Sequence, residues 1–513
     1  MPLSYSLSLL NSLNSLKNPP LRERMIIDEL RYQILRQFAF DPTAEQDAAI
    51  TVFARFLTDR HPQTVMILRG SAGTGKTSLA GAIVRTMVAL RQKVMLLAPT
   101  GRAAKVFALN SGHAAFTIHR RIYRERAYSG IGGRFNLNDN LHQDTLFIID
   151  EASMVSAGSG FTDGNSMFGS GNLLDDLVGF VYSGRNDRLL LIGDRAQLPP
   201  VGEEEAPALS GEVLEGYGLK VYECDLNEVL RQSSTSGILY NATVIRRMIT
   251  HDEGTQLPKI RFRGFADISM VPGGELIEAL ATSYTEVGQD ETMVITRSNK
   301  RANIYNQGIR NAVLDREDEL CTGDMLMIVK NNYSLTAPSR SGEERDSRAP
   351  SFLANGDRAK VLRVRNVRQL YGFRFADTWL QFPDYDDYEL RATVILDTLT
   401  SEAPALTREQ SERLFNGIME DYADLPLKKD RMDKLRSDSH FNALQVKFGY
   451  AVTCHKAQGG QWAHIYLDQG YMTDDMLTPD YIHWLYTAFT RASEKLFLVN
   501  WPKTQTDGDV EAE

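Results

Sequence analysis

The chain has few cysteines, no long hydrophobic run and no excess of positive charge. Its three cysteines, Cys224, Cys321 and Cys454, have the spacing of neither a disulfide framework nor a zinc site. No run approaches the ~20 apolar residues that a membrane span needs, and residues 1–20 contain no basic leader. We therefore expect a protein of a reducing compartment, the cytoplasm, with no membrane anchor and no export signal.

The charge balance limits the kind of partner. The net charge is −9 and the isoelectric point is near 5.6, which argues against a surface covered with nonspecific phosphate contacts. Any nucleic-acid-binding surface must therefore be local. The 513 residues, 42% of them hydrophobic, predict about three or four domains of ~100 to 200 residues each.

One glycine-rich segment has a specific chemical meaning. Residues 70–77 read Gly-Ser-Ala-Gly-Thr-Gly-Lys-Thr, and they stand between a predicted strand at 65–68 and a predicted helix at 78–90. Backbone N–H groups of such a loop bind phosphate oxygens, Lys76 reaches the β and γ phosphates, and Thr77 binds Mg²⁺. The residues expected at the nucleotide are Gly70, Ser71, Ala72, Gly73, Thr74, Gly75, Lys76, Thr77 and Ser78.

Two further strand ends supply the groups that hydrolysis requires. The apolar run 146–149 ends in Asp150, which can bind Mg²⁺ with its water shell, and in Glu151, which can deprotonate the attacking water. The run 189–193 leads to Gln197, whose amide can respond to a γ phosphate through a reversible hydrogen bond. Because the ends of parallel strands meet at one edge of a sheet, the sequence predicts a nucleotide hydrolase.

The order of predicted elements divides the chain. Strands alternate with helices in two regions, and alternating strands around tight turns predict a small antiparallel barrel inserted into the second region. The predicted parts are an N-terminal helical segment at 1–38, a first α/β domain at 39–224 with a hairpin insertion at about 118–145, a second α/β domain at 225–335 and 441–505, the barrel with a helical, charged insertion at 336–440, and an acidic tail at 506–513.

Several segments in a fixed order together resemble one family. They are the phosphate loop and residues 98–104, 150–154, 193–201, 226–232, 452–459 and 486–492. This set is similar to the superfamily 1 DNA helicases, and within them to the RecD-like and Dda-like branch that moves 5′ to 3′. The resemblance implies two RecA-like P-loop NTPase domains with parallel sheets, a pin-like hairpin and an SH3-like β-barrel.

The resemblance also assigns residues around the nucleotide. Gln46 matches the family's adenine-reading glutamine, whose amide can donate and accept on the adenine edge, so ATP with Mg²⁺ is expected. Arg231 and Arg491 match two arginines that cross the interdomain cleft to the γ phosphate. Gly459 belongs to the segment near the nucleotide. Gln461 stands where many relatives have a carboxylate on the sugar, which leaves ribose discrimination open.

A track for single-stranded DNA is implied in the same way. Hydroxyls, backbone amides and basic side chains hold a phosphate backbone without reading its sequence. The matching positions are Pro99, Thr100, Arg102, His119, Thr453, His455 and Lys456.

The function implied is that of a monomeric, ATP-dependent motor. It would move along single-stranded DNA and unwind duplex at junctions, in DNA repair or recombination. Two alternatives stay open: a translocase on DNA or RNA that displaces proteins without unwinding, and a nucleotide-gated switch for partner binding. Residues 299–302 lack the aspartate that guanine recognition would need, which argues against a GTPase.

Overall fold

The computed structural model of the chain describes residues 19–38, 41–128, 133–158, 169–228, 235–251, 257–332, 334–335 and 353–507. Arg231, residues 1–18 of the expected N-terminal segment and residues 508–513 of the expected acidic tail lie outside these ranges. Within them, no helix is both long and apolar enough to cross a membrane.

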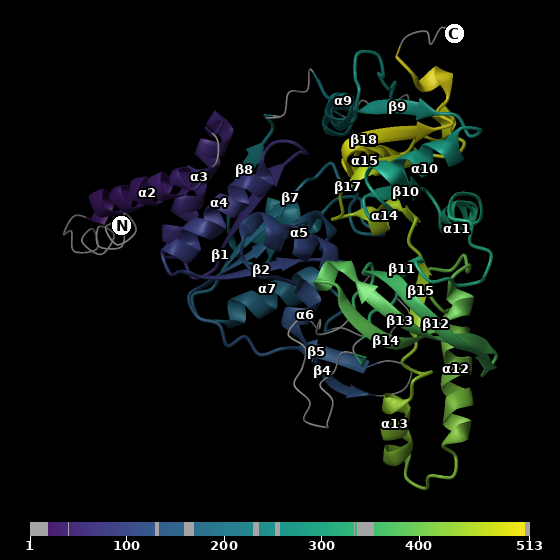
Figure 1. The fold of residues 1–513 in the computed structure, drawn as a ribbon. Helices are drawn as coiled ribbons and strands as arrows, with labels where there is room; N and C mark the ends of the chain where they lie inside the picture. Colours follow the sequence, from purple (N-terminus) through teal and green to yellow (C-terminus); the bar gives the residue numbers. More distant parts are fainter. Residues whose placement is uncertain are drawn as a thin grey trace.

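A six-stranded parallel sheet forms the first α/β unit, with the strand order β3-β2-β6-β7-β1-β8 (Figure 1). Its strands are β1 (Thr64–Gly70), β2 (Lys93–Ala98), β3 (Ala115–Thr117), β6 (Thr145–Ile149), β7 (Arg188–Gly193) and β8 (Lys220–Leu226). All seven residues of β1 are buried, and alternate β1 side chains enter the two cores on opposite faces of the sheet. A strand that is buried on both faces needs a continuous apolar run, which is what 65–68 provides.

Helices cover both faces of this sheet. Side chains of α2 (Pro19–Arg36), α3 (Ala44–Thr58) and α4 (Lys76–Ala89) share one core, and those of α6 (Ile118–Ile122), α7 (Leu173–Ser183) and α8 (Gly211–Gly216) share the other. The helix α5 (Gly101–Ser111) follows β2. The predicted hairpin consists of β4 (Tyr123–Tyr128) and β5 (Gly133–Leu137), which pair in antiparallel orientation.

A second parallel sheet has the strand order β16-β10-β17-β18-β9. Its strands are β9 (Ile268–Val271), β10 (Thr292–Thr296), β16 (Ala451–Thr453), β17 (Trp462–Asp468) and β18 (Ala492–Val499). Its helices are α9 (Gly237–His251), α10 (Leu276–Glu286), α11 (Asn299–Gly308), α14 (Cys454–Ala457) and α15 (Pro479–Phe489). The predicted α/β class with two parallel sheets is confirmed.

The inserted barrel is closed and five-stranded. Its strands are β11 (Met325–Ile328), β12 (Arg358–Leu370), β13 (Phe373–Phe382), β14 (Tyr388–Ile395) and β15 (Leu444–Phe448). Two helices, α12 (Arg408–Asp421) and α13 (Lys428–Ser437), project beyond the barrel at the bottom of Figure 1. They are anchored by an apolar cluster that includes Phe373, Phe375 and Leu414.

The barrel extends past both edges of the expected range 336–440. Its first and last strands, β11 and β15, lie outside that range. The run 446–452, read from the sequence as one strand of the second sheet, is two strands: β15 belongs to the barrel and β16 to the sheet, and Gly449 and Tyr450 connect them. Both strands are short and largely buried, so the local sequence pattern does not mark the change of sheet between them.

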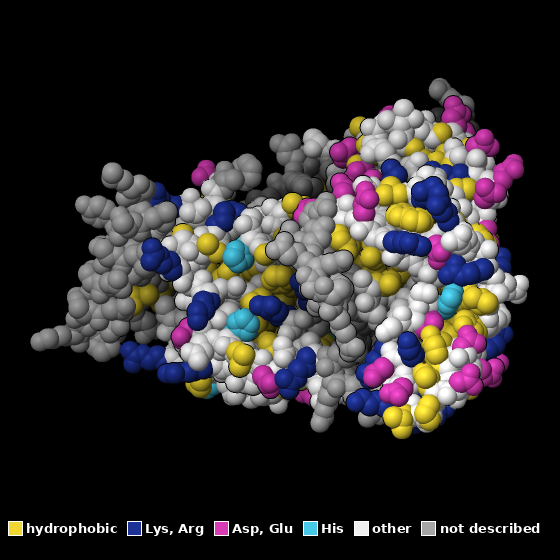
Figure 2. All heavy atoms as spheres, turned by 60° about the horizontal axis from the view of Figure 1, so that its bottom comes forward, with side chains coloured by type: hydrophobic (Ala, Val, Ile, Leu, Met, Phe, Trp, Pro, Cys, Tyr) yellow, Lys and Arg dark blue, Asp and Glu magenta, His cyan; other side chains and the backbone are white. Residues whose placement is uncertain are grey.

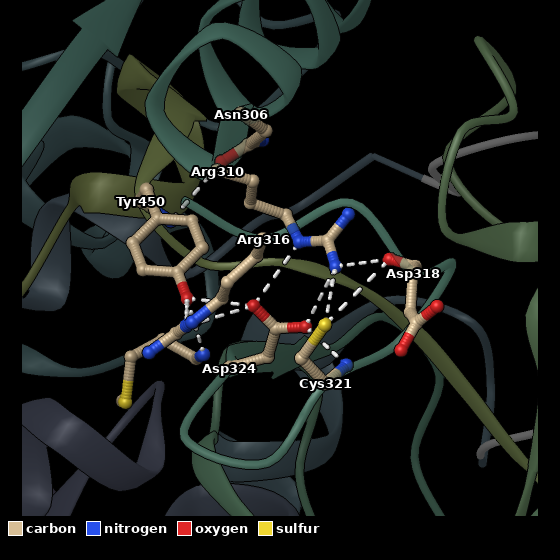
Figure 3. A network of polar contacts seen from close by, with 8 residues as sticks. Asn306, Arg310, Arg316, Asp318, Cys321, Asp324 and Tyr450 are labelled. Carbon is tan, nitrogen blue, oxygen red and sulfur yellow. Dashed lines mark hydrogen bonds and ion pairs between the residues drawn. The ribbon is translucent and has the colours of Figure 1, made fainter. Parts of the chain in front are cut away.

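A buried polar network fixes the junction between barrel and second sheet (Figure 3). Asp324, which directly precedes β11, is 0% exposed. Its carboxylate accepts hydrogen bonds from Arg310 Nε and Nη2, both at 3.1 Å, from Arg316 Nη1 at 2.9 Å and from the Tyr450 hydroxyl at 3.0 Å. The N–H of Cys321 adds a bond of 2.7 Å. Because Asp324 and Tyr450 stand at the two places where the chain crosses between sheet and barrel, this network joins the two parts into one unit.

Candidate nucleotide and nucleic-acid sites

The phosphate loop joins β1 to α4 as a tight cradle. Gly73 and Gly75 both have φ of 81°, a backbone conformation that side chains disfavour. Gly70 has no space for a side chain, because a Cβ there would lie 2.7 Å from Thr74 Oγ1 and 3.1 Å from Leu226 Cβ. The glycines are therefore required by the shape of the loop, and the cradle fits a group that binds through backbone N–H donors.

The start of α4 is suited to an anion. No side chain caps its N-terminus, so its first N–H groups and the helix dipole can act on a phosphate. Lys76 Nζ donates to the carbonyls of Gly70 at 2.5 Å and Ser71 at 2.9 Å. Thr77 and Ser78 are exposed beside it. Within the loop, the Thr74 hydroxyl donates to Ser71 O at 2.8 Å.

Gln46 lies directly behind the loop. It is 1% exposed and is the third residue of α3, where its Oε1 accepts the N–H of Thr43 at 3.1 Å in a capping box. Its Nε2 donates to Thr74 O at 3.0 Å. The amide thus ties α3 to the loop, and each of its polar atoms keeps capacity for one more hydrogen bond. Its contact with adenine stays a prediction.

β6 delivers the acidic pair to the edge of the sheet. Burial, together with the neighbouring Glu151 carboxylate, raises the pKa of Asp150 well above its usual range. Glu151 has φ of 53°, and its N–H donates to Asp150 Oδ1 at 2.9 Å. A left-handed conformation of a residue other than glycine costs about 1–3 kcal/mol, and such strain gathers at functional sites. Asp150 and Glu151, which the sequence predicted as metal ligand and base, therefore occupy a strained turn beside the phosphate loop.

Gln197 connects this acidic pair to the second α/β unit. It follows β7 and is 5% exposed. In the amide orientation that satisfies both neighbours, Nε2 donates to Glu151 Oε2 at 3.2 Å and Oε1 accepts from Arg491 Nη2 at 3.1 Å. One amide therefore bonds to a carboxylate from the first sheet and to an arginine from the second unit.

Arg491 is 3% exposed and follows α15. Its guanidinium donates to the neutral oxygens Thr487 O at 3.1 Å, Gly460 O at 3.2 Å and Thr490 Oγ1 at 3.1 Å. These three partners are neutral oxygens and not carboxylates, and the contact of Arg491 with the γ phosphate stays a prediction. Arg231, the other arginine expected to cross the cleft, lies outside the described residues.

The first part of the expected strand track lies at the junction of β2 and α5. Pro99 precedes Thr100, the N-cap of α5, whose hydroxyl accepts the N–H of Ala103 at 3.2 Å. Arg102 reaches across to the second unit: its Nη2 donates to Gln461 O at 2.6 Å, and its guanidinium carbon lies 4.4 Å from the Trp462 ring centroid. Burial and the nearby Arg358 lower the pKa of Arg102.

Gly459 lies against this same junction. It has φ of 72°, and a Cβ there would lie 2.9 Å from Ala103 Cβ and 3.2 Å from Thr100 Oγ1. The sequence assigned Gly459 to the nucleotide, whereas its close neighbours here are residues next to the expected strand track. The segment after α14 and the start of α5 therefore pack together tightly, which requires a glycine.

The second part of the track is the β16–α14 segment. Thr453 is the N-cap of α14 but makes no side-chain capping bond, and His455 is exposed. Burial and then the neighbouring Lys447 lower the pKa of Lys456 to about 8.

His119, which is also expected on the track, lies in α6 of the first unit. Burial lowers its pKa to about 4, so its imidazole is neutral at pH 7.

A pocket of about 480 Å³ opens beside α5. It is lined by residues of α5 and of the β3–α6 segment and, on the other side, by barrel residues 384–386. Lys105 Nζ links the two sides, because it donates to Pro383 O at 2.6 Å. On the face shown in Figure 2, Lys and Arg side chains are dispersed among other types, and they do not form one continuous basic surface.

Comparisons with known proteins agree with this two-part arrangement. The AAA domain family matches residues 43–247, which include the first sheet, and the UvrD-like helicase C-terminal domain family matches residues 448–499, which include β16, β17 and β18. An ATP-dependent RecD2 DNA helicase from Deinococcus radiodurans is 23% identical over 443 residues, which are 84% of this chain and 46% of that protein. Over most of its length the chain is therefore similar to the superfamily 1 helicases of the RecD type.

Other relatives differ in length. An uncharacterized protein of Methanocaldococcus jannaschii is 23% identical over 89% of this chain and 38% of its own length. An uncharacterized protein of Acanthamoeba polyphaga mimivirus is 22% identical over 85% of this chain and 96% of its own length. The chain thus spans less than half the length of the first two relatives. Among solved structures, a Pif1 helicase from Bacteroides in complex with ADP-AlF3 and ssDNA has 14% identity and a TM-score of 0.44, over 92% of this chain and 95% of that chain.

Two residues of the second unit, Arg246 and Tyr486, contact the phosphate loop although the sequence assigned them no role. Arg246, in α9, donates to Ser71 Oγ at 2.5 Å and to Asn227 Oδ1 at 2.6 Å. The hydroxyl of Tyr486, in α15, accepts the N–H of Ala72 at 3.0 Å. Tyr486 is the first residue of the segment 486–492, which resembles a helicase motif, so the sequence contained a signal for it. Arg246 lies in an ordinary amphipathic helix, where no local pattern distinguishes it from a surface charge.

Proposed function

We propose that this chain is an ATP-dependent DNA helicase that couples ATP hydrolysis between its two α/β units to movement along single-stranded DNA. The observation that carries this proposal is the bridge from Glu151 through Gln197 to Arg491. A hydrolytic site whose base is bonded across the domain boundary changes its geometry whenever the domains move. Hydrolysis and domain motion are then linked through one amide.

The residues of the first unit have separate tasks in this reaction. Loop amides and Lys76 would hold the phosphates, and Thr77 and Asp150 would hold Mg²⁺, which would neutralise charge on the phosphate oxygens. Glu151 takes the proton from the attacking water, whose oxygen forms a bond to the γ phosphorus as the bond to the β–γ bridging oxygen breaks, giving ADP and phosphate. Arg491, and Arg231 by family analogy, stabilise the charge that develops on the transferred group.

The strand contacts come from both units. Thr100 and Arg102 at the start of α5 and Thr453, His455 and Lys456 around α14 would hold the DNA backbone without reading bases. Closing and opening of the cleft would alternate the grip of the two units. The 5′ to 3′ direction is proposed by family analogy. We propose a monomer acting on single strands and duplex junctions. We propose the cytoplasm as its location, because all three cysteines are unpaired.

The first test is steady-state ATPase activity of wild type and Glu151→Gln, with and without single-stranded DNA. A large stimulation by DNA that Glu151→Gln abolishes is the expected result. ATP turnover that is changed neither by single-stranded DNA nor by Glu151→Gln contradicts a DNA motor and favours the nucleotide-gated switch.

A second assay separates unwinding from translocation. Duplexes with a 5′ or a 3′ single-stranded tail and tailed strands blocked by bound streptavidin are offered to the same protein. Unwinding of the 5′-tailed duplex is expected. Displacement of streptavidin without unwinding of either duplex favours the translocase.

A further inference from the structure

Tyr486 connects the phosphate loop to the segment that follows β7. It lies in α15 of the second unit and is 1% exposed. Its hydroxyl donates to Asp194 Oδ2 at 2.6 Å and accepts the N–H of Ala72 at 3.0 Å. A phenol oxygen therefore occupies one backbone donor of the loop that is expected to bind the phosphates.

We propose that the Tyr486 hydroxyl is an exchangeable ligand of the phosphate loop. It binds the Ala72 N–H when the loop holds no phosphate and releases it when a nucleotide enters, so that α15 and the Asp194 segment respond to the state of the loop. This inference rests on the proposed ATP-dependent function and adds to it a positioning residue that couples occupancy of the loop to the second unit.

The chemistry of the phenol suits an exchange. Burial, and then the neighbouring Asp194 carboxylate, raises the pKa of Tyr486 well above its usual range, so the hydroxyl is neutral at physiological pH. A neutral oxygen accepts a hydrogen bond less strongly than a charged phosphate oxygen does. The phosphate can therefore displace the phenol from Ala72, while the bond from the phenol to Asp194 can persist.

The contacts around Tyr486 transmit such a change. The next residue of α15, Thr487, accepts the N–H of Leu198 on its Oγ1 at 2.8 Å, and Gln458 Nε2 donates to Leu198 O at 2.8 Å. His483 Nδ1 lies 3.0 Å from Ala196 O. The segment 194–198, which contains Gln197, is thus held along α15, and a shift of this helix moves the bridge to Glu151.

A second element of the same unit grips the adjacent loop residue. Arg246 of α9 donates to Ser71 Oγ at 2.5 Å. Neighbouring residues of the loop, Ser71 and Ala72, are therefore held by two different helices of the second unit. This pairing is a contact between domains rather than the packing of one side chain, and it makes the loop a point at which the second unit can detect phosphate.

The test uses Tyr486→Phe, with Tyr481→Phe as the matched control. Tyr481 lies in the same helix, is 2% exposed and donates its hydroxyl to Gln469 Oε1 instead of touching the loop. The probes are fluorescent Mg·ADP and Mg·AMP-PNP in equilibrium binding, followed by kcat and KM for ATP with and without single-stranded DNA. Because a competing hydrogen bond of ordinary strength is removed, Tyr486→Phe should bind both nucleotides about three- to tenfold more tightly.

The kinetic signature separates coupling from structural damage. In Tyr486→Phe, KM for ATP should fall, turnover without DNA should rise, and the ratio of stimulation by DNA should fall. Tyr481→Phe should leave KM for ATP, turnover without DNA and the ratio of stimulation by DNA within about twofold of wild type, because Tyr481 does not touch the phosphate loop. A gain in affinity is an outcome that a merely destabilised fold does not produce.

Several results would overturn the inference. Equal affinities of Tyr486→Phe and Tyr481→Phe, or weaker binding in Tyr486→Phe, contradict an exchange at Ala72. If Tyr486→Phe does not fold, Asp194→Asn is the variant that tests the inference. Loss of the carboxylate that accepts the hydrogen bond of the phenol should also tighten nucleotide binding, by a smaller factor than Tyr486→Phe. Unchanged nucleotide binding in Asp194→Asn refutes the inference. If wild type itself binds neither nucleotide, the proposed ATP-dependent function is what fails.

Discussion

Arg102 of the first α/β unit stacks on Trp462 of the second, with the guanidinium carbon 4.4 Å from the ring centroid. The same guanidinium donates to the carbonyl of Gln461. An arginine expected to hold DNA thus also holds the two units together. Domain closure and strand binding share this side chain, so a change at Arg102 should affect both.

Replacing Arg102 by Lys should weaken coupling while the charge is kept. The ammonium cannot form the planar stack, and loss of a cation–π contact predicts an increase of about two- to tenfold in the DNA concentration that gives half-maximal ATPase. The DNA titration of the ATPase measures it. Arg55→Lys, on the exposed surface of α3, is the matched control. A normal titration curve for Arg102→Lys would contradict the shared role.

Gln197→Ala should separate nucleotide binding from hydrolysis. The truncation removes both bonds of the bridge, to Glu151 and to Arg491, and leaves in place the loop amides and Lys76 that would hold the phosphates. We expect kcat to fall by about 10²-fold or more, as for loss of a positioned polar group, while the nucleotide Kd changes little. Stopped-flow turnover and equilibrium binding give the two numbers. Gln143→Ala, an exposed glutamine, serves as control, and parallel loss of affinity and kcat would argue for a folding defect instead.

Arg246→Gln should weaken nucleotide binding. Arg246 brings a positive charge to Ser71 in a loop that binds a polyanion. We expect an increase of about three- to tenfold in the Kd of Mg·ADP, smaller at high salt because screening reduces the contribution of the charge. Arg247→Gln removes the same charge from an exposed position of the same helix. Equal effects of the two variants would assign the change to general electrostatics.

Binding of single-stranded DNA should weaken as pH rises through about 8. The Lys456 ammonium is charged below its pKa of about 8 and neutral above it, so its attraction for phosphate is present at low pH and lost at high pH. Lys456→Arg keeps its charge throughout and should bind with a flatter profile between about pH 7 and 9. Fluorescence anisotropy across this range measures it. Identical profiles would exclude Lys456 as the titrating contact.

Asp324→Asn should destabilise the protein strongly. The substitution leaves Arg310 and Arg316 buried without their carboxylate, and breaking a buried ion pair in this way costs about 3–5 kcal/mol of unfolding free energy. Chemical denaturation followed by tryptophan fluorescence measures the loss. Asp318→Asn, in the same loop, is the control, because Asp318 accepts Arg310 through its backbone oxygen. A loss below about 1 kcal/mol would show that the network does not hold the barrel.

The sequence by itself determined the parts whose chemistry is local. The phosphate loop was predictable because a strand, a glycine turn and a helix start define it within a few consecutive residues. The acidic pair and the two parallel sheets were predictable from short apolar runs that alternate with helices, the run of β6 ending in the acidic pair. The closed barrel was predictable in kind, from its turns and alternating strands, but its limits were not. The strands on either side of Gly449 are both short and largely buried, and which sheet each strand joins depends on distant partners.

The tertiary structure alone decided how the second unit meets the loop. Ala72 and Tyr486 are 414 residues apart in sequence, and Ser71 and Arg246 are 175 apart. No local propensity encodes contacts of that separation, because they arise when two independently formed units dock. For the same reason the sequence predicted the residues Glu151, Gln197 and Arg491 separately, and only the packing of α15 against the segment 194–198 joined them through one amide.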